Sequence, residues 1–197
     1  MCSVNCLWKW TIAFSNLPKV KCVLPSPDKP FWIEQAACLS SSTPVSFTKE
    51  ASFFDAWALK GNSILRLIHY PPVPDSSNIL RARAHEDINL ITLLVGAEES
   101  GLEVQNTDGD WIPIAAKSKS IVCNIGDMMQ LVTRSQLKST THRVVDNNAG
   151  SSASRYSMPF FLHPSPEIEL CSIVDESTDS ISAHDFLEER LKAIKLY

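Results

Sequence analysis

The chain has 197 residues, of which 44% are hydrophobic and 20% are charged, and its formal net charge at pH 7 is -4. A chain of this size and composition buries one core, which excludes a disordered, fibrous or membrane protein as the expected class. Because neither sign of charge is gathered into a long run, we expect no nucleic acid and no membrane as partner, and a small-molecule substrate instead.

The first 50 residues differ in composition from the remainder. They hold four of the six cysteines and three of the five tryptophans, contain no glycine, and show no sustained period of apolar residues. We therefore divide the chain into an atypical N-terminal segment of uncertain structure, residues 1–50, and one folded domain, residues 51–197. The apolar stretch from Leu7 to Leu17 is interrupted by Lys9, is too short to span a bilayer and lacks the features of a secretory signal. We expect a cytoplasmic protein whose scattered cysteines are unpaired thiols.

A short amphipathic helix is predicted at the start of the folded domain. Phe47, Ala51, Phe54 and Ala58 recur at helical spacing, and Gly61 follows as a C-terminal stop.

After this helix come short runs rich in aliphatic and β-branched residues, separated by turn residues, which is typical of an all-β sandwich or barrel. The runs are 63–70, 80–85, 90–95, 102–105, 111–114, 120–125, 129–133, 141–145 and 156–162. Their number fits a jelly roll. Asp108-Gly109 predicts a tight hairpin turn, and Gly126 with Asp127 predicts a turn between the strands 120–125 and 129–133.

The end of the chain predicts a second helix. Ser182 followed by Asp185 forms a start that resembles a capping box, and one apolar face is formed by Phe186, Leu187, Leu191 and Ile194. The fold class is thus mainly β, with a short helix before the jelly roll and a C-terminal helix after it.

Two histidines and one aspartate are the candidate metal ligands. His85 and Asp87 are two residues apart, so both side chains point to one side of an extended chain while Glu86 points to the other. His142 stands at the head of another predicted strand. Two histidines and one carboxylate form the facial triad of non-haem iron(II) oxygenases, which leaves positions open for substrate and oxygen.

Arg155 and Ser157 show the same two-residue spacing on the last predicted strand, where both would face one way and Tyr156 the other. An arginine offers a planar fork of donors that suits a carboxylate, and the serine adds a hydroxyl. Iron(II), one aspartate, a bound dicarboxylate and this arginine together sum to zero charge, which a water-poor barrel tolerates.

The residues around these candidates resemble the isopenicillin N synthase-like family of iron(II)/2-oxoglutarate-dependent oxygenases. The order and spacing of the segments that carry this resemblance are more specific than any single motif. The segments are Ser63-Ile-Leu-Arg-Leu-Ile-His-Tyr-Pro-Pro72, Ala84-His-Glu-Asp-Ile-Asn-Leu-Ile-Thr-Leu-Leu94, Gly101-Leu-Glu-Val104, Asp108-Gly-Asp-Trp-Ile-Pro113, Asn124-Ile-Gly-Asp127, Ser139-Thr-Thr-His-Arg-Val-Val145 and Arg155-Tyr-Ser-Met-Pro-Phe-Phe161.

The resemblance covers the chain from about Phe53 and implies a double-stranded β-helix, in which the strand ending at His85 lies antiparallel to the strand starting at His142. It implies Fe(II), 2-oxoglutarate as co-substrate and O2 as oxidant, with hydroxylation, desaturation or ring closure of a small molecule. The distal carboxylate of 2-oxoglutarate would lie on Arg155 and Ser157. Tyr70 matches a family tyrosine near the co-substrate, although Ile68 replaces the asparagine that normally accompanies it.

Two alternatives stay open at this point. One is an oxidase of the isopenicillin N synthase type that uses no 2-oxoglutarate, and the other is a truncated, non-catalytic jelly-roll module. Family members also carry a longer N-terminal region that packs on the barrel, which residues 1–50 do not resemble. An uncovered barrel face would favour a homo-oligomer or a covering partner.

Overall fold

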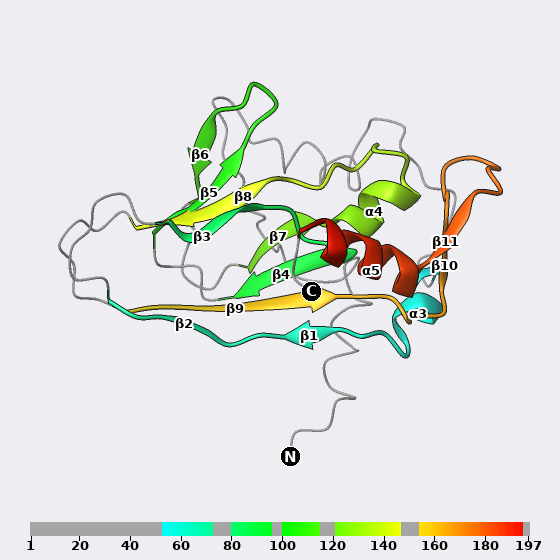
Figure 1. The fold of residues 1–197 in the computed structure, drawn as a ribbon, viewed down its shortest axis with the longest axis horizontal. Coiled ribbons are helices and arrows are strands. Elements are labelled where there is room, and N and C mark those ends of the chain that lie inside the picture. The colour runs from blue at the N-terminus through cyan, green and yellow to red at the C-terminus, as the bar shows by residue number, and fades with distance from the viewer. Residues whose placement is uncertain (1–52, 73–79, 96–99, 115–120, 147–153, 195–197) are drawn as a thin grey trace, which may run out of the picture.

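The structure is a computed structural model that describes residues 53–72, 80–95, 100–114, 121–146 and 154–194. The predicted N-terminal segment 1–50, with four of the six cysteines, and the first part of the predicted helix therefore lie outside the described residues. Two antiparallel sheets are stacked in layers, and three helices gather at one end of them (Figure 1). Within the described residues, no helix is both long and apolar enough to cross a membrane.

The larger sheet has β9 as its central strand, with β1 and β2 on one side of it and β4 and then β7 on the other. Its strands are β1 (Ile64–Leu65), β2 (Ile68–Tyr70), β4 (Ile91–Val95), β7 (Ile121–Ile125) and β9 (Arg155–Leu162). The predicted strand 63–70 is thus split in two, and both halves pair with β9. All of these pairings are antiparallel.

The smaller sheet has the order β3, β8, β5, β6, again with antiparallel neighbours. Its strands are β3 (Leu80–His85), β5 (Leu102–Gln105), β6 (Trp111–Pro113) and β8 (His142–Val145). The expected hairpin joins β5 to β6, and Gly109 adopts a φ of +89° in its turn. These two stacked sheets confirm the predicted jelly roll.

Strand β9 explains how the larger sheet presents polar groups to the space between the layers. Its side chains alternate, with Arg155 and Ser157 buried and Tyr156 and Met158 exposed. The alternation follows from the pleat of an extended strand. The predicted pair Arg155 and Ser157 therefore shares the inner face of the barrel.

A hydrophobic core lies where the helices meet the end of the larger sheet. The helices are α3 (Phe53–Ala58), α4 (Asp127–Val132) and α5 (Ala183–Ala193). Trp57 of α3, Met128 of α4 and Leu90 beside β4 are buried in one hydrophobic cluster. The predicted cap of α5 is confirmed, because the Ser182 side chain accepts a hydrogen bond from the backbone N–H of Asp185.

The prediction of a strand at 129–133 was wrong, because these residues belong largely to helix α4. Met128, Met129 and Val132 are buried, which is the spacing of a helical face rather than the alternation of a strand. Methionine, glutamine and leucine are also good helix formers. Gly126 is consequently the N-terminal cap of the helix rather than part of a turn between two strands.

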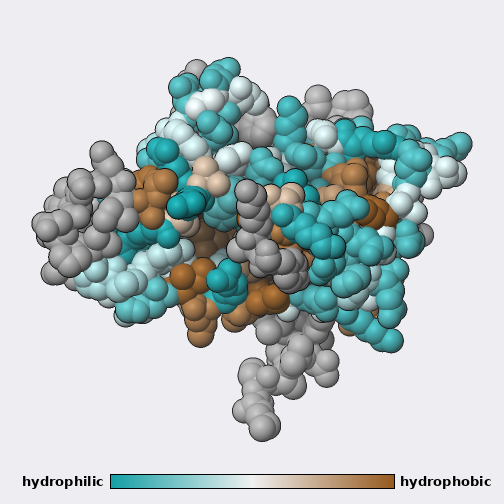
Figure 2. Space-filling model, viewed as in Figure 1, coloured by the Kyte–Doolittle hydropathy of each residue, from teal (hydrophilic) through white to brown (hydrophobic). Residues whose placement is uncertain are grey.

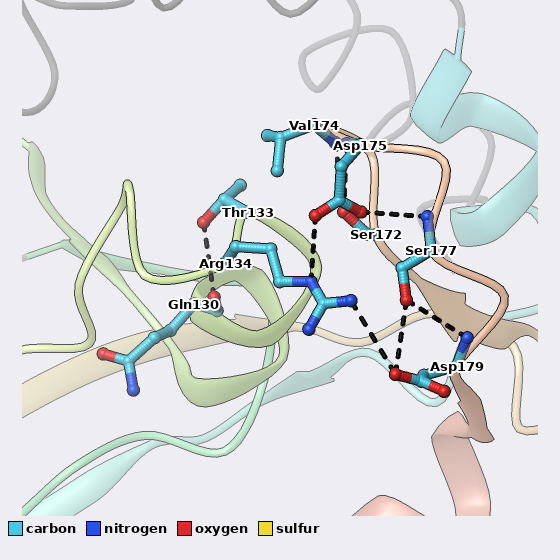
Figure 3. Close-up of polar contacts among 8 residues, drawn as sticks. All are labelled: Gln130, Thr133, Arg134, Ser172, Val174, Asp175, Ser177 and Asp179. Carbon is cyan, nitrogen blue, oxygen red and sulfur yellow. Dashed lines mark hydrogen bonds and ion pairs between the residues drawn. The ribbon is translucent and has the colours of Figure 1, made fainter.

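Strands β10 (Glu169–Cys171) and β11 (Ser180–Ser182) form a hairpin that was not predicted from the sequence. The chain that leaves α4 contacts this hairpin. Arg134 reaches Asp175 at 3.4 Å and Asp179 at 4.0 Å in the hairpin loop (Figure 3). Two hydrogen bonds hold the pKa of Asp175 below its usual value. The larger effect comes from the Ser172 side chain and the smaller from the backbone of Ser177. This loop therefore fixes the end of α4 against the β10–β11 hairpin.

Candidate metal centre

The three predicted ligands meet at one mouth of the barrel. His85 ends β3, His142 begins β8, and the two residues face each other in the antiparallel register of these strands. The Oδ1 atom of Asp87 lies 3.9 Å from Nε2 of His85 and 3.8 Å from Nε2 of His142. All three donor atoms lie within 4.8 Å of one another. The predicted strand pairing is thus confirmed, and it brings the three side chains together.

Backbone carbonyls orient both imidazole rings. Nδ1 of His85 lies 2.6 Å from the carbonyl oxygen of Arg83, and Nδ1 of His142 lies 3.0 Å from that of Thr140. A carbonyl only accepts hydrogen bonds, so each Nδ1 carries a proton, and Nε2 is the nitrogen of each ring that is turned toward Asp87 and left to bind a metal. Burial lowers the pKa of His142, an effect that the Asp87 carboxylate partly opposes. The neutral form of His142, which is the form that binds a metal, is therefore favoured.

Two side chains hold the Asp87 carboxylate from behind. Its Oδ2 atom accepts hydrogen bonds from Thr92 Oγ1 at 2.6 Å and from Asn124 Nδ2 at 2.7 Å. Asn89 in turn donates to Thr92 Oγ1 at 2.9 Å. Because Oδ2 is occupied by these donors, Oδ1 is the oxygen that faces the two histidines. The carboxylate is thus held in one orientation before any ion binds.

Asn89, Thr92 and Asn124 were missed by the sequence analysis as functional residues. Thr92 and Asn124 face each other in the register of β4 and β7, and both are buried. A signal for Thr92 and Asn124 was present in the sequence, because each is a polar residue inside an apolar run that is predicted to be a strand. Buried polar groups normally have a hydrogen-bond partner, so such a pair indicates a polar site nearby.

A cavity of about 320 Å³ opens behind the three ligands and contains the other predicted site residues. Arg155 is 5% exposed, and its guanidinium carbon lies 5.3 Å from the centre of the Tyr70 ring. Tyr70 and Arg155 are partners in the register of β2 and β9, as are Ile68 and Ser157. The structure thus places Arg155, Ser157 and Tyr70 on one wall of the cavity that the candidate ligands also line.

The remaining walls combine apolar side chains with further arginines. Arg81 lines the cavity as well, and its Nη2 atom pairs with Asp146 Oδ2 at 2.9 Å. The apolar part of the lining comes from both sheets and includes Leu94, Leu102, Val104, Val122 and Val144. An apolar cavity with a few convergent polar groups is the usual form of a small-molecule site.

The donor set fits a first-row divalent metal ion. Nitrogen and oxygen donors lie about 2.1 Å from such an ion, so two donors of one ion are at most about 4.2 Å apart. The distances of 3.8 and 3.9 Å between Asp87 and the two histidines satisfy this limit, and the donor atoms of the two histidines lie within 4.8 Å of each other. Among the described residues, this is the one group of histidine, cysteine and acidic side chains whose donor atoms converge in this way. His69, to which no ligand role is assigned, instead stacks on Tyr156 with ring centres 4.7 Å apart.

Residues 61–164 match the family model of the 2OG-Fe(II) oxygenase superfamily, a span that includes every candidate site residue. A 2-oxoglutarate-dependent dioxygenase of Didymella fabae is 34% identical over 146 residues, which are 68% of this chain and 44% of that protein.

Solved structures give the same result. A 2OG-Fe(II) oxygenase family protein from Caulobacter crescentus superimposes with a TM-score of 0.71 at 36% identity, over 97% of this chain and 58% of that one. A full-length Neurospora crassa protein in complex with alpha-KG and thymine gives a TM-score of 0.70 at 25% identity, over 97% of this chain and 56% of that one. The chain therefore spans less than two thirds of the length of each of these relatives.

Proposed function

The chain belongs to the 2OG-Fe(II) oxygenase superfamily, and from this premise we propose that it is a non-haem iron(II), 2-oxoglutarate-dependent oxygenase that oxidises a C–H bond of a small molecule. The observation that carries the proposal is the convergence of His85, Asp87 and His142 at the mouth of a cavity that also holds the buried Arg155. Fe(II), 2-oxoglutarate and O2 are the cofactor, co-substrate and oxidant of this superfamily.

In this proposal, His85, Asp87 and His142 are the iron ligands. Two imidazoles and one carboxylate on one face of an ion leave its other positions open. The Arg83 and Thr140 carbonyls hold the two rings, so that little motion is needed when the ion binds. Partners of this kind raise the basicity of a ligand as well as orienting it.

Arg155 and Ser157 bind the distal carboxylate of 2-oxoglutarate in the same proposal. Both side chains are buried and face the cavity, with exposed fractions of 5% and 4%. A charge-assisted pair with a planar guanidinium is stronger in such a site than in water, because the surroundings screen it less. Tyr70 supports the guanidinium through its ring face.

Iron, when bound, would supply the site at which O2 becomes an oxidant for a C–H bond, with 2-oxoglutarate providing two of the electrons and leaving as succinate and carbon dioxide, while the protein binds and orients. The apolar side chains Leu94, Leu102 and Val144 keep water away from the reacting atoms. That the Neurospora crassa relative was solved with thymine supports a small molecule as the substrate class.

The first experiment is an anaerobic titration of the protein with Fe(II) and then with 2-oxoglutarate. We expect the visible charge-transfer absorption of an iron complex with a bound keto acid, and its loss in Asp87→Ala. Gln105→Leu, which changes a half-buried residue of the β5–β6 hairpin whose exposed amide donates to the Gly109 carbonyl, is the matched control that keeps the band. Folded wild-type protein that gives no band would contradict the proposal.

The second experiment separates the proposal from the two alternatives. Succinate formed in proportion to the oxygen consumed supports a 2-oxoglutarate-dependent enzyme. Oxygen consumption without succinate would instead indicate an oxidase of the isopenicillin N synthase type. Iron binding without oxygen consumption across a broad set of small molecules would indicate a non-catalytic module.

We also propose that the outer face of the larger sheet forms the contact in a homo-oligomer. Leu65, Leu67, Tyr156 and Met158 are 54%, 76%, 57% and 38% exposed and come from neighbouring strand segments. Figure 2 shows apolar residues gathered over β1 and β9. A contiguous apolar surface of this kind is typical of a protein contact.

Light scattering after size exclusion tests the contact. Leu67→Glu combined with Met158→Glu should lower the oligomer mass, because two charges would be buried. Leu59→Glu, at a residue that is 70% exposed just after α3, should leave the mass unchanged. A wild-type monomer would contradict the homo-oligomer.

A further inference from the structure

A cluster of charged side chains lies beside the run that contains His85 and Asp87. Nη2 of Arg190, on helix α5, lies 2.5 Å from Asp127 Oδ2 and 3.7 Å from Glu86 Oε2. Glu86 is the residue between the two candidate ligands, and Asp127 is the first residue of α4. One guanidinium therefore bridges two acidic residues from different parts of the chain.

Each of these acidic residues makes a further hydrogen bond, one to a candidate ligand and the other to the residue before one. Oε1 of Glu86 accepts from Thr141 Oγ1 at 2.9 Å, and Thr141 immediately precedes His142. The backbone N–H of Asp127 donates to the carbonyl oxygen of Asp87 at 2.7 Å. The cluster thus connects α5 to the chain at all three ligands, although α5 itself supplies none of them.

Burial makes this connection stiff. Asp127 is 5% exposed, and Arg190 is the ion-pair partner of its carboxylate. The Arg190 side chain is 38% exposed, so only the Asp127 side of this ion pair is buried. Removing Arg190 leaves the buried Asp127 carboxylate uncompensated, which favours a rearrangement of the surrounding groups. If Arg190 is lost, Asp127 must therefore move or take up water. The backbone around Asp87 would then move as well.

We propose that Arg190 is a positioning residue for the iron site, acting through Glu86 and Asp127 on the segment that carries His85 and Asp87. This inference rests on the proposed function, because it assumes that these residues bind iron. Helix α5 would then support the site through Arg190 without supplying a ligand.

The test compares Fe(II) affinity, measured anaerobically by competition with a chromophoric chelator and without 2-oxoglutarate. Arg190→Gln removes a positive charge near a cation site, so charge alone would tighten Fe(II) binding. Loss of positioning would weaken it, by about 10-fold or more. The sign of the change therefore separates the two effects.

Two further variants complete the comparison. Arg190→Lys should restore much of the affinity, because an ammonium can still pair with Asp127. Lys192→Gln removes the same charge from the same helix at a residue whose side chain is 68% exposed, and should leave affinity unchanged. With Glu86→Gln already in place, Arg190→Gln should weaken binding less, because one of its two connections is already broken.

A measurement on the unmodified chain does not depend on whether the variants fold. Fe(II) should slow hydrogen exchange of backbone amides in α5 around Arg190, although no residue of α5 is a ligand. Unchanged exchange in α5, or a folded Arg190→Gln protein that binds Fe(II) as tightly as the wild type, would overturn the proposal. Failure of the wild type to bind Fe(II) at all would instead contradict the proposed function itself, and this inference with it.

Discussion

The side-chain amide of Asn124 donates a hydrogen bond of 2.7 Å to Oδ2 of Asp87, although the two residues are 37 positions apart. Together with Thr92, this contact determines which carboxylate oxygen faces the two histidines. The orientation of the candidate ligand Asp87 thus depends on strands β4 and β7, neither of which carries a candidate ligand.

Asn124→Leu should weaken Fe(II) binding by about 10- to 100-fold, which is the usual effect of losing a hydrogen bond to a ligand. The leucine keeps the side-chain volume but leaves Oδ2 of Asp87 with one donor. Chelator competition measures the affinity. The exposed amide of Gln105 provides the control, and an unchanged affinity in Asn124→Leu would show that Thr92 suffices.

Arg155→Lys should raise the 2-oxoglutarate concentration needed for half-maximal binding by about 100-fold, while Fe(II) affinity stays unchanged. A lysine keeps the charge but loses the planar fork that binds both carboxylate oxygens. Truncating one partner of a buried, hydrogen-bonded charge pair costs about 2–5 kcal/mol, which sets this scale. Calorimetric titration measures both affinities. An equal loss of Fe(II) binding would indicate a structural role for Arg155.

Gly126→Ala should destabilise the protein by about 1–3 kcal/mol, the usual cost of forcing an extra group into a packed site. A Cβ atom there would overlap the carbonyl oxygen of Asn89. Urea unfolding measures the change. Gly109→Ala is the comparison, because its Cβ meets no atom closer than 4.0 Å and its cost of about 1 kcal/mol arises from positive φ alone. Equal costs for the two changes would contradict the steric explanation.

Ser135→Gly should raise the free energy of unfolding by about 1 kcal/mol, because Ser135 has a φ of +61° that side chains disfavour. Thermal unfolding measures the gain. The same substitution at Ser180, which lies in strand β11, should instead destabilise the protein. A lower melting temperature in Ser135→Gly would mean that the serine side chain is needed at the end of α4.

Much of the fold followed from local patterns. Runs rich in aliphatic and β-branched residues predicted most strands, and the Asp108-Gly109 turn and the Ser182 cap lie where they were expected. The segment 129–133 did not follow, because a short apolar run fits a strand and a buried helical turn equally well until its packing is known. The cytoplasmic location and the domain boundary at residue 50 stay predictions.

The sequence by itself determined which residue types stand at the metal site, because the spacing of His85 and Asp87 on an extended chain places both on one side. It also determined that Arg155 and Ser157 share a face. Only the tertiary structure decided what holds these groups in place. Asn124 and Thr92 donate to Asp87 from strands β7 and β4, and Arg190 of α5 pairs with the neighbouring Glu86 and Asp127. Contacts of that kind leave no regular spacing in a sequence. The packing of the two sheets and of α5 determines which residues these side chains contact.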